Sequence, residues 1–123
     1  MKTTDLMWLL AGVMLNASAQ LGLKAATRST GRIDGGAVSL WLAGQQLAVT
    51  PLFWFALLTY GISVGVWVVG LSRVPVSQAY PVLSLGYVLA ALFASPLLGE
   101  IVSPLRWLGI AVVIGGVWMI ARS

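Results

Sequence analysis

Long apolar stretches alternate with short polar links along this chain. Each stretch is long enough for a helix that crosses a bilayer, which takes roughly 20 mostly apolar residues. We therefore predict an all-α membrane protein with four transmembrane helices, forming a single domain over residues 1–123. The predicted spans run from about Leu6 to Ala26, Pro51 to Leu71, Val76 to Leu98 and Pro104 to Ala121.

The links between these spans differ in length. "SRVP" and "GEIVSP" are so short that the helices they join must be antiparallel neighbours. In the longer first link, "TRSTGRIDGG" predicts a loop, and "AVSLWLAGQQLAVT" predicts either a short interfacial helix or an extension of the second span. The N-terminal segment also has features of a signal sequence, but Asp5 and the continuing apolar run argue against cleavage after Ala19.

Composition supports the membrane class and narrows the chemistry. The chain is 59% hydrophobic and 8% charged, which is too apolar for a soluble domain of this size. It contains no cysteine, no histidine and three acidic residues, so we expect no metal site, no cofactor and no enzyme activity. No "GxxxxGK[ST]" phosphate loop occurs. The net charge of +4 is spread along the chain, which indicates membrane topology and headgroup contact rather than nucleic-acid binding.

The cations barely decide the orientation of the bundle. Positively charged residues favour the cytoplasmic side, and here both sides carry nearly equal numbers of them. Two alternatives stay open: a fixed orientation, or insertion in both orientations, which would permit an antiparallel dimer. One side collects Lys2, Arg73 and Arg122, and the other collects Lys24, Arg28, Arg32 and Arg106.

The first span carries an unusual row of polar side chains. Gly12, Asn16, Gln20 and Lys24 are spaced four apart and share one helical face. A lysine facing lipid at mid-bilayer costs about 2.5–3.5 kcal/mol on insertion scales, so this row should face protein or water. One interpretation is a substrate cavity whose fixed charge is positive, which favours an anionic head such as a phosphate. The alternatives are that Lys24 reaches the headgroups and that the amides bond neighbouring helices.

The second and third spans offer further contacts for a substrate. Pro81 either sits in the first turn of the third span or bends it. Gly61 and Gly65 would let another backbone approach closely. The tyrosines could instead belong to an interfacial aromatic belt, and Arg73 could simply be solvated. The candidate substrate-binding residues on these segments are Tyr60, Ser63, Trp67, Arg73, Gln78, Tyr80, Ser84 and Tyr87.

The fourth span carries small residues and no charge in its interior. Gly109 and Gly116 lie seven apart on one face, a spacing that suits contact between helices. We interpret this helix as structural and predict that these two glycines form a dimer interface.

The stretches "RVPVSQAYPVLSLGYVLAAL", "LLGE" and "SPLRWLGIAVVIGGVWMI", together with "AQLGLKAA" in the first span, resemble the small four-helix, EamA-like branch of the drug/metabolite transporter superfamily. Within it the chain is most similar to the subunit family of the aminoarabinose-phosphoundecaprenol flippase. The resemblance implies a multi-pass protein of the bacterial inner membrane that moves a lipid-linked anionic substrate during lipid A modification. It also implies a homodimer, or a heterodimer with a sister four-helix subunit.

The chain departs from the related small multidrug resistance transporters at two positions. Asn16 stands where the resemblance places their first-helix carboxylate, and Leu83 replaces an aromatic residue. Tyr60 and Tyr80 keep their places. An amide neither titrates nor carries charge, so we expect no proton-coupled export of organic cations through this site. An exporter of neutral or anionic small solutes, and a non-transporting subunit that needs a partner, stay open as alternatives.

Overall fold

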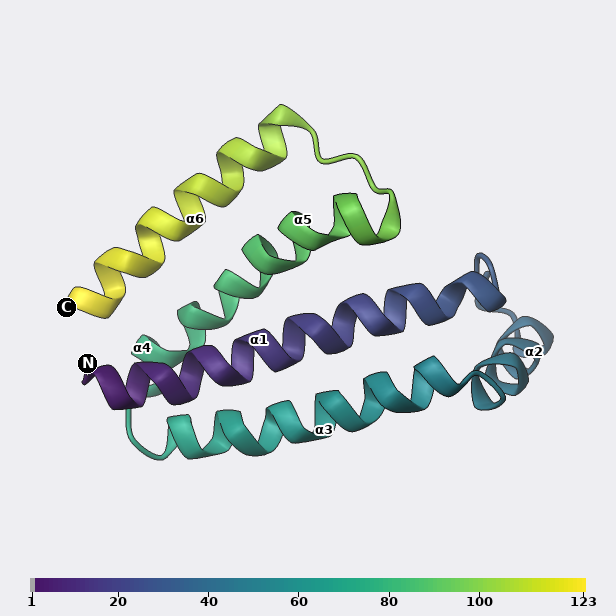
Figure 1. The fold of residues 1–123 in the computed structure, drawn as a ribbon, viewed down its shortest axis with the longest axis horizontal. Helices are drawn as coiled ribbons and strands as arrows, with labels where there is room; N and C mark the ends of the chain where they lie inside the picture. The colour runs from purple at the N-terminus through teal and green to yellow at the C-terminus, as the bar shows by residue number, and fades with distance from the viewer. Residues whose placement is uncertain (1) are drawn as a thin grey trace.

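The computed structural model describes residues 2–123, and every regular element in that part of the chain is a helix (Figure 1). Four helical stretches are long and apolar enough to cross a membrane, so the predicted all-α, four-span fold is confirmed. They cover Thr3–Ser29, Pro51–Leu71, Val76–Leu98 and Pro104–Arg122. The elements are α1 (Thr3–Ala26), η1 (Thr27–Ser29), α2 (Ala37–Ala48), α3 (Pro51–Leu71), α4 (Val76–Ala79), η2 (Tyr80–Ser84), α5 (Leu85–Leu98) and α6 (Pro104–Arg122).

The helix ends follow from local sequence. α3 and α6 each begin with a proline, whose fixed φ and missing N–H suit the first helical turn. The Ser103 hydroxyl caps α6 by accepting a hydrogen bond from the backbone N–H of Arg106 at 3.3 Å. α5 ends because Gly99 adopts a left-handed conformation with φ of 71°, which a residue without a Cβ adopts readily.

The segment after the first loop forms its own helix. α2 is separated from α3 by Val49 and Thr50, so it does not extend the second span. The indole N–H of Trp54 donates to the carbonyl of Ala48 at 2.8 Å and ties the two helices together at this corner. The location of α2 at a membrane surface stays a prediction.

Small residues let α1 and α3 pack tightly. A Cβ added at Gly12 would lie 3.3 Å from the Cα of Trp67, and one at Gly22 would lie 3.1 Å from the Cβ of Ala56. α1 lies between α3 and α5, and α6 is outermost, beside α5 (Figure 1). A cluster of buried hydrophobic residues joins these helices and consists of Leu9, Val13, Val74, Ala79, Val82 and Val117.

The third span is not one continuous α-helix. It starts as α4, tightens into the 3₁₀ helix η2 where Pro81 occurs, and continues as α5. Pro81 has no N–H to donate to the preceding turn, which explains why regular α-helical bonding is interrupted there. Tyr80 and Ser84 of η2 line a hollow whose other wall includes residues of α1.

Candidate functional site

A hollow that contains several of the predicted site residues lies between α1 and the η2–α5 segment. Its volume is about 490 Å³. Tyr80 and Tyr87 are 65% and 70% exposed, so the hollow opens sideways out of the bundle. It brings together five of the residues that the sequence singled out, and small residues make the room between them. Its lining consists of Asn16, Ala17, Gln20, Tyr80, Leu83, Ser84, Gly86, Tyr87 and Ala90.

A second, smaller hollow lies on the α3 side of α1 and measures about 140 Å³. It contains three further candidates, Tyr60, Ser63 and Trp67. The Ser63 hydroxyl is buried and donates to the carbonyl of Tyr60 at 2.6 Å, so its proton is already used within α3. Asn16 and Leu83 line both hollows and therefore form the partition between them.

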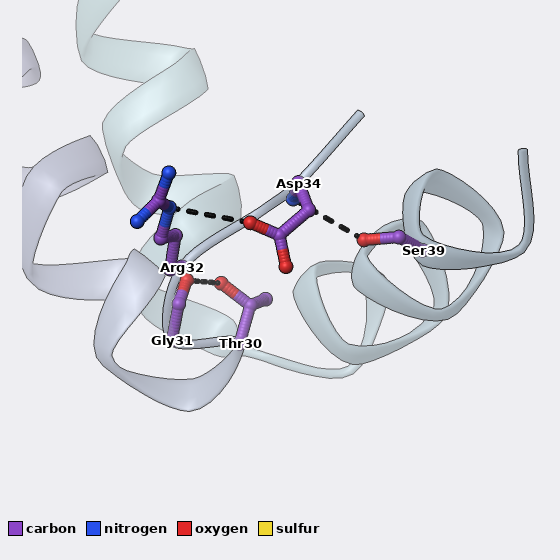
Figure 2. Close-up of polar contacts among 5 residues, drawn as sticks. All are labelled: Thr30, Gly31, Arg32, Asp34 and Ser39. Carbon is purple, nitrogen blue, oxygen red and sulfur yellow. Dashed lines mark hydrogen bonds and ion pairs between the residues drawn. The ribbon is translucent and has the colours of Figure 1, made fainter. Parts of the chain in front are cut away.

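Lys24 lines a third hollow, of about 390 Å³, at the C-terminal end of α1. Arg28 and Arg32 line it as well, together with the carboxyl end of α5 at Leu98. The guanidinium of Arg28 donates to the carbonyl of Leu98 at 3.1 Å. Arg32 pairs with Asp34 at 3.2 Å on an exposed loop, and the Asp34 backbone N–H donates to Ser39 (Figure 2). Sequence reasoning did not identify Arg28 and Arg32 as lining residues, although Arg28 continues the four-residue spacing from Lys24.

The polar row of α1 thus runs through all three hollows in order. Gly12 lines the small hollow, Asn16 lines both inner hollows, Gln20 lines the main one and Lys24 lines the outer one. Of the residues that the structure places around these three hollows, none is acidic. Among mostly apolar lining residues, this row of hollows, which we call the path, therefore offers amides and hydroxyls near its middle and cations at one end.

Arg73 and Gln78 are not among the residues lining the three hollows. Arg73 pairs with Asp5 at 3.6 Å and lies 5.9 Å from the ring centre of Trp8, at the opposite end of α1 from Lys24. Gln78 is half-buried in α4. A role for either residue in substrate binding stays a prediction.

The glycines with open surfaces differ from those inside the bundle. A Cβ at Gly109, Gly116, Gly61 or Gly65 would meet nothing within 4 Å, so no close helix contact within the chain uses these positions. The dimer interface at Gly109 and Gly116 stays a prediction, and the surface of both glycines is open to a second helix. The sequence did not predict the close contact between Gly70 and Leu9. Predicting it requires the register in which α1 and α3 pack, and neither residue indicates that register by itself.

Comparisons with known proteins agree with this architecture. The model of the EamA-like transporter family matches residues 3–122. The chain is similar to the probable 4-amino-4-deoxy-L-arabinose-phosphoundecaprenol flippase subunit ArnF of Sodalis glossinidius, with 37% identity over 115 residues that cover 92% of this chain and 87% of the relative. Subunit ArnE of Escherichia coli strain 55989 is 39% identical over 86 residues, 70% of this chain and 68% of the relative.

A shorter match covers subunit ArnE of Pseudomonas fluorescens strain Pf0-1, with 40% identity over 74 residues. That alignment spans 60% of this chain and 65% of the relative. No solved structure matches the chain. Four spanning helices and bacterial flippase relatives make it a multi-pass protein of the inner membrane. Because the family model covers nearly the whole sequence, the chain belongs to the EamA-like transporter family.

Proposed function

We propose that this chain is a subunit of a flippase that moves a polyprenyl-phosphate-linked sugar, or a similarly anionic lipid, across the inner membrane. The observation that carries the proposal is the path along α1, whose polar lining residues include amides, hydroxyls and cations and no acidic residue. The names of the flippase subunits that the chain resembles support the same substrate class.

The sign of the charge favours an anionic substrate. In a low-dielectric site, an uncompensated cation attracts anions and repels organic cations over several ångströms. Asn16 and Gln20 supply neutral donors and acceptors that suit sugar hydroxyls, and Tyr80, Ser84 and Tyr87 supply more of them. The main hollow, of about 490 Å³, falls in the size range of small-molecule sites.

The sideways opening suits a substrate with a long apolar tail. Tyr80 and Tyr87 stand at an exposed edge rather than around a closed pore. A polyprenyl chain remains in the bilayer while the polar head enters between α1 and α5. No chemical step is needed for this task, and we propose a carrier rather than an enzyme.

A second four-helix subunit would complete the path. Carriers of this kind alternate access by moving one repeat against another around a site near the membrane centre, and this chain supplies one repeat. We propose a pair formed either by two copies or by this chain and a sister subunit, in contact through Gly109 and Gly116 of α6. Both glycines have open surfaces.

The test is lipid translocation in proteoliposomes that contain a polyprenyl-phosphate-linked amino sugar. Exposure of its amine to a membrane-impermeant reagent would be followed over time, with this chain alone and with a sister subunit. We expect the protein to accelerate exposure of the inner-leaflet lipid and Gln20→Leu to slow it, with Ser95→Leu on the exposed end of α5 as the control. If the wild-type protein does not accelerate exchange in either arrangement, the proposal is wrong.

A further inference from the structure

We infer that the hollow lined by Lys24, Arg28 and Arg32 is a docking site for the phosphate of the lipid, occupied before the head enters the main hollow between α1 and α5. This inference rests on the proposed function and adds to it the location of the phosphate and the end of the bundle at which loading occurs. It concerns a site next to the main hollow rather than inside it, since Lys24 lines only the outer of the two.

The charge balance of this end of the molecule favours an anion. Within residues 2–123, Asp5 pairs with Arg73 at the far end of α1, and Asp34 pairs with Arg32. The third acidic residue, Glu100, follows the end of α5 two residues after Leu98, lines a different hollow together with Arg106, and forms no ion pair within residues 2–123. Neither Lys24 nor Arg28 has a carboxylate partner in that part of the chain. The pair between Arg32 and Asp34 is exposed, with side chains 91% and 72% accessible, so it contributes little stability and can exchange for another anion.

Arg28 is held in place for this role. One of its terminal nitrogens donates to the Leu98 carbonyl at the end of α5, which fixes the direction of the guanidinium. A guanidinium has five N–H donors, so several stay available for phosphate oxygens in the planar geometry that phosphate prefers. The contact also connects η1, the turn that follows α1, to the end of α5. The main hollow lies between α1 and α5.

The docking site and the main hollow are consecutive along one helical face. Gln20 lines the main hollow and Lys24, one turn later, lines the docking site. A lipid whose phosphate binds at Lys24 therefore has its sugar within reach of Gln20 and the tyrosines. The site lies at one end of the bundle only, because the opposite end of α1 carries the Asp5–Arg73 pair.

The experiment measures binding of undecaprenyl phosphate to the full chain, alone and with a sister subunit, in phosphatidylcholine nanodiscs. We expect Lys24→Gln and Arg28→Gln each to weaken binding about tenfold, the effect of losing one charge-assisted hydrogen bond. Arg106→Gln is the matched control, since Arg106 lies at the same end of the bundle but lines a different hollow. It should bind as the wild type does.

One variant should act in the opposite direction. Asp34→Asn removes the carboxylate that neutralises Arg32, so we expect it to tighten binding, by up to about tenfold. A cluster that only stabilises helix ends would not respond in this way. If Arg28→Gln fails to fold, Lys24→Gln and Asp34→Asn still test the docking site. In the described residues the Lys24 side chain makes no hydrogen bond that stabilises a helix end.

Inorganic phosphate and phosphatidylglycerol serve as competitors. We expect undecaprenyl phosphate to resist displacement by both. Its tail, which inorganic phosphate lacks, keeps it in the bilayer, and its phosphate monoester is less hindered than the phosphodiester of phosphatidylglycerol. Equal displacement by phosphatidylglycerol would mean ordinary headgroup contact and would overturn the inference, and displacement by inorganic phosphate alone would identify a soluble anion as the ligand. If the wild type binds and exchanges the lipid and no cation variant changes either property, the docking site is wrong but the proposed function is not contradicted. Absence of both binding and exchange in the wild type would refute the proposed function itself.

Discussion

The two sides of α1 are built in opposite ways. Toward α3, glycines bring backbone against backbone, as where a Cβ on Gly12 would lie 3.3 Å from the Cα and N of Trp67. Toward α5, one turn further along, Asn16 and Gln20 border a hollow of about 490 Å³. A single helix thus contributes to a closely packed interface, interrupted by the small hollow of about 140 Å³, and to a more open one. We call the α3 side the sealed side, and residue size and polarity distinguish the two.

The difference indicates which part of the bundle is fixed. Close small-residue contacts gain dispersion energy over many atom pairs and tolerate little displacement. A hollow lined by amides and tyrosines lacks those contacts on its open side and has little to resist a change in width. We therefore expect α1 and α3 to move together as one wall and the boundary with α5 to change during transport.

The largest effect should come from filling the sealed side. Gly12→Leu places a side chain against the Trp67 backbone, which cannot yield as a flexible side chain would. We expect about 1–3 kcal/mol of lost stability, measured as the free energy of unfolding in mixed micelles. The control is Gly65→Leu on α3, where a Cβ meets nothing within 4 Å. Equal losses from both variants would contradict the tight contact.

The open side should respond to charge. Asn16→Glu places a carboxylate on the partition between both inner hollows. We expect exchange of the anionic lipid to fall about tenfold or more, equivalent to about 1.4 kcal/mol, and binding of an aromatic cation to appear. Lipid exchange and dye binding in the same proteoliposomes measure both, with Asn16→Gln as the variant that keeps the amide. If lipid exchange by Asn16→Glu were as fast as in the wild type, the lipid head would not pass Asn16.

This contrast could be predicted only in part from the sequence. The lengths of the apolar stretches predicted the fold, and the four-residue spacing from Gly12 to Lys24 predicted the polar row. The sequence could not show that Lys24 lies beyond the main hollow, because this depends on where α5 ends relative to α1. The partner of Arg73 could not be predicted either, since Asp5 is far from it in the sequence and contacts it only after α1 and α3 pack antiparallel.

Helix α6 offers a third kind of surface, neither sealed nor hollow. Gly109 and Gly116 face open space, and we expect Gly109→Leu with Gly116→Leu to weaken dimerisation by about 1 kcal/mol, as bulk blocks a close helix contact. Cross-linking yield against protein-to-detergent ratio measures this. Gly115→Leu, next to Gly116 but on another face, is the control. Dimers of wild-type strength in the double variant would place the interface elsewhere.

The smallest effect should come from the ion pair that fastens the sealed side at its end. Asp5→Asn removes the contact with Arg73, whose side chain is 45% exposed, so solvent already screens much of the attraction. We expect a loss of about 0.2–1 kcal/mol in the free energy of unfolding, with Arg73 still stacked near Trp8. Asp34→Asn breaks the far more exposed pair with Arg32 and should leave stability unchanged. If Asp5→Asn had no effect on stability and instead slowed lipid exchange, this end of α1 would belong to the moving boundary rather than to the fixed wall.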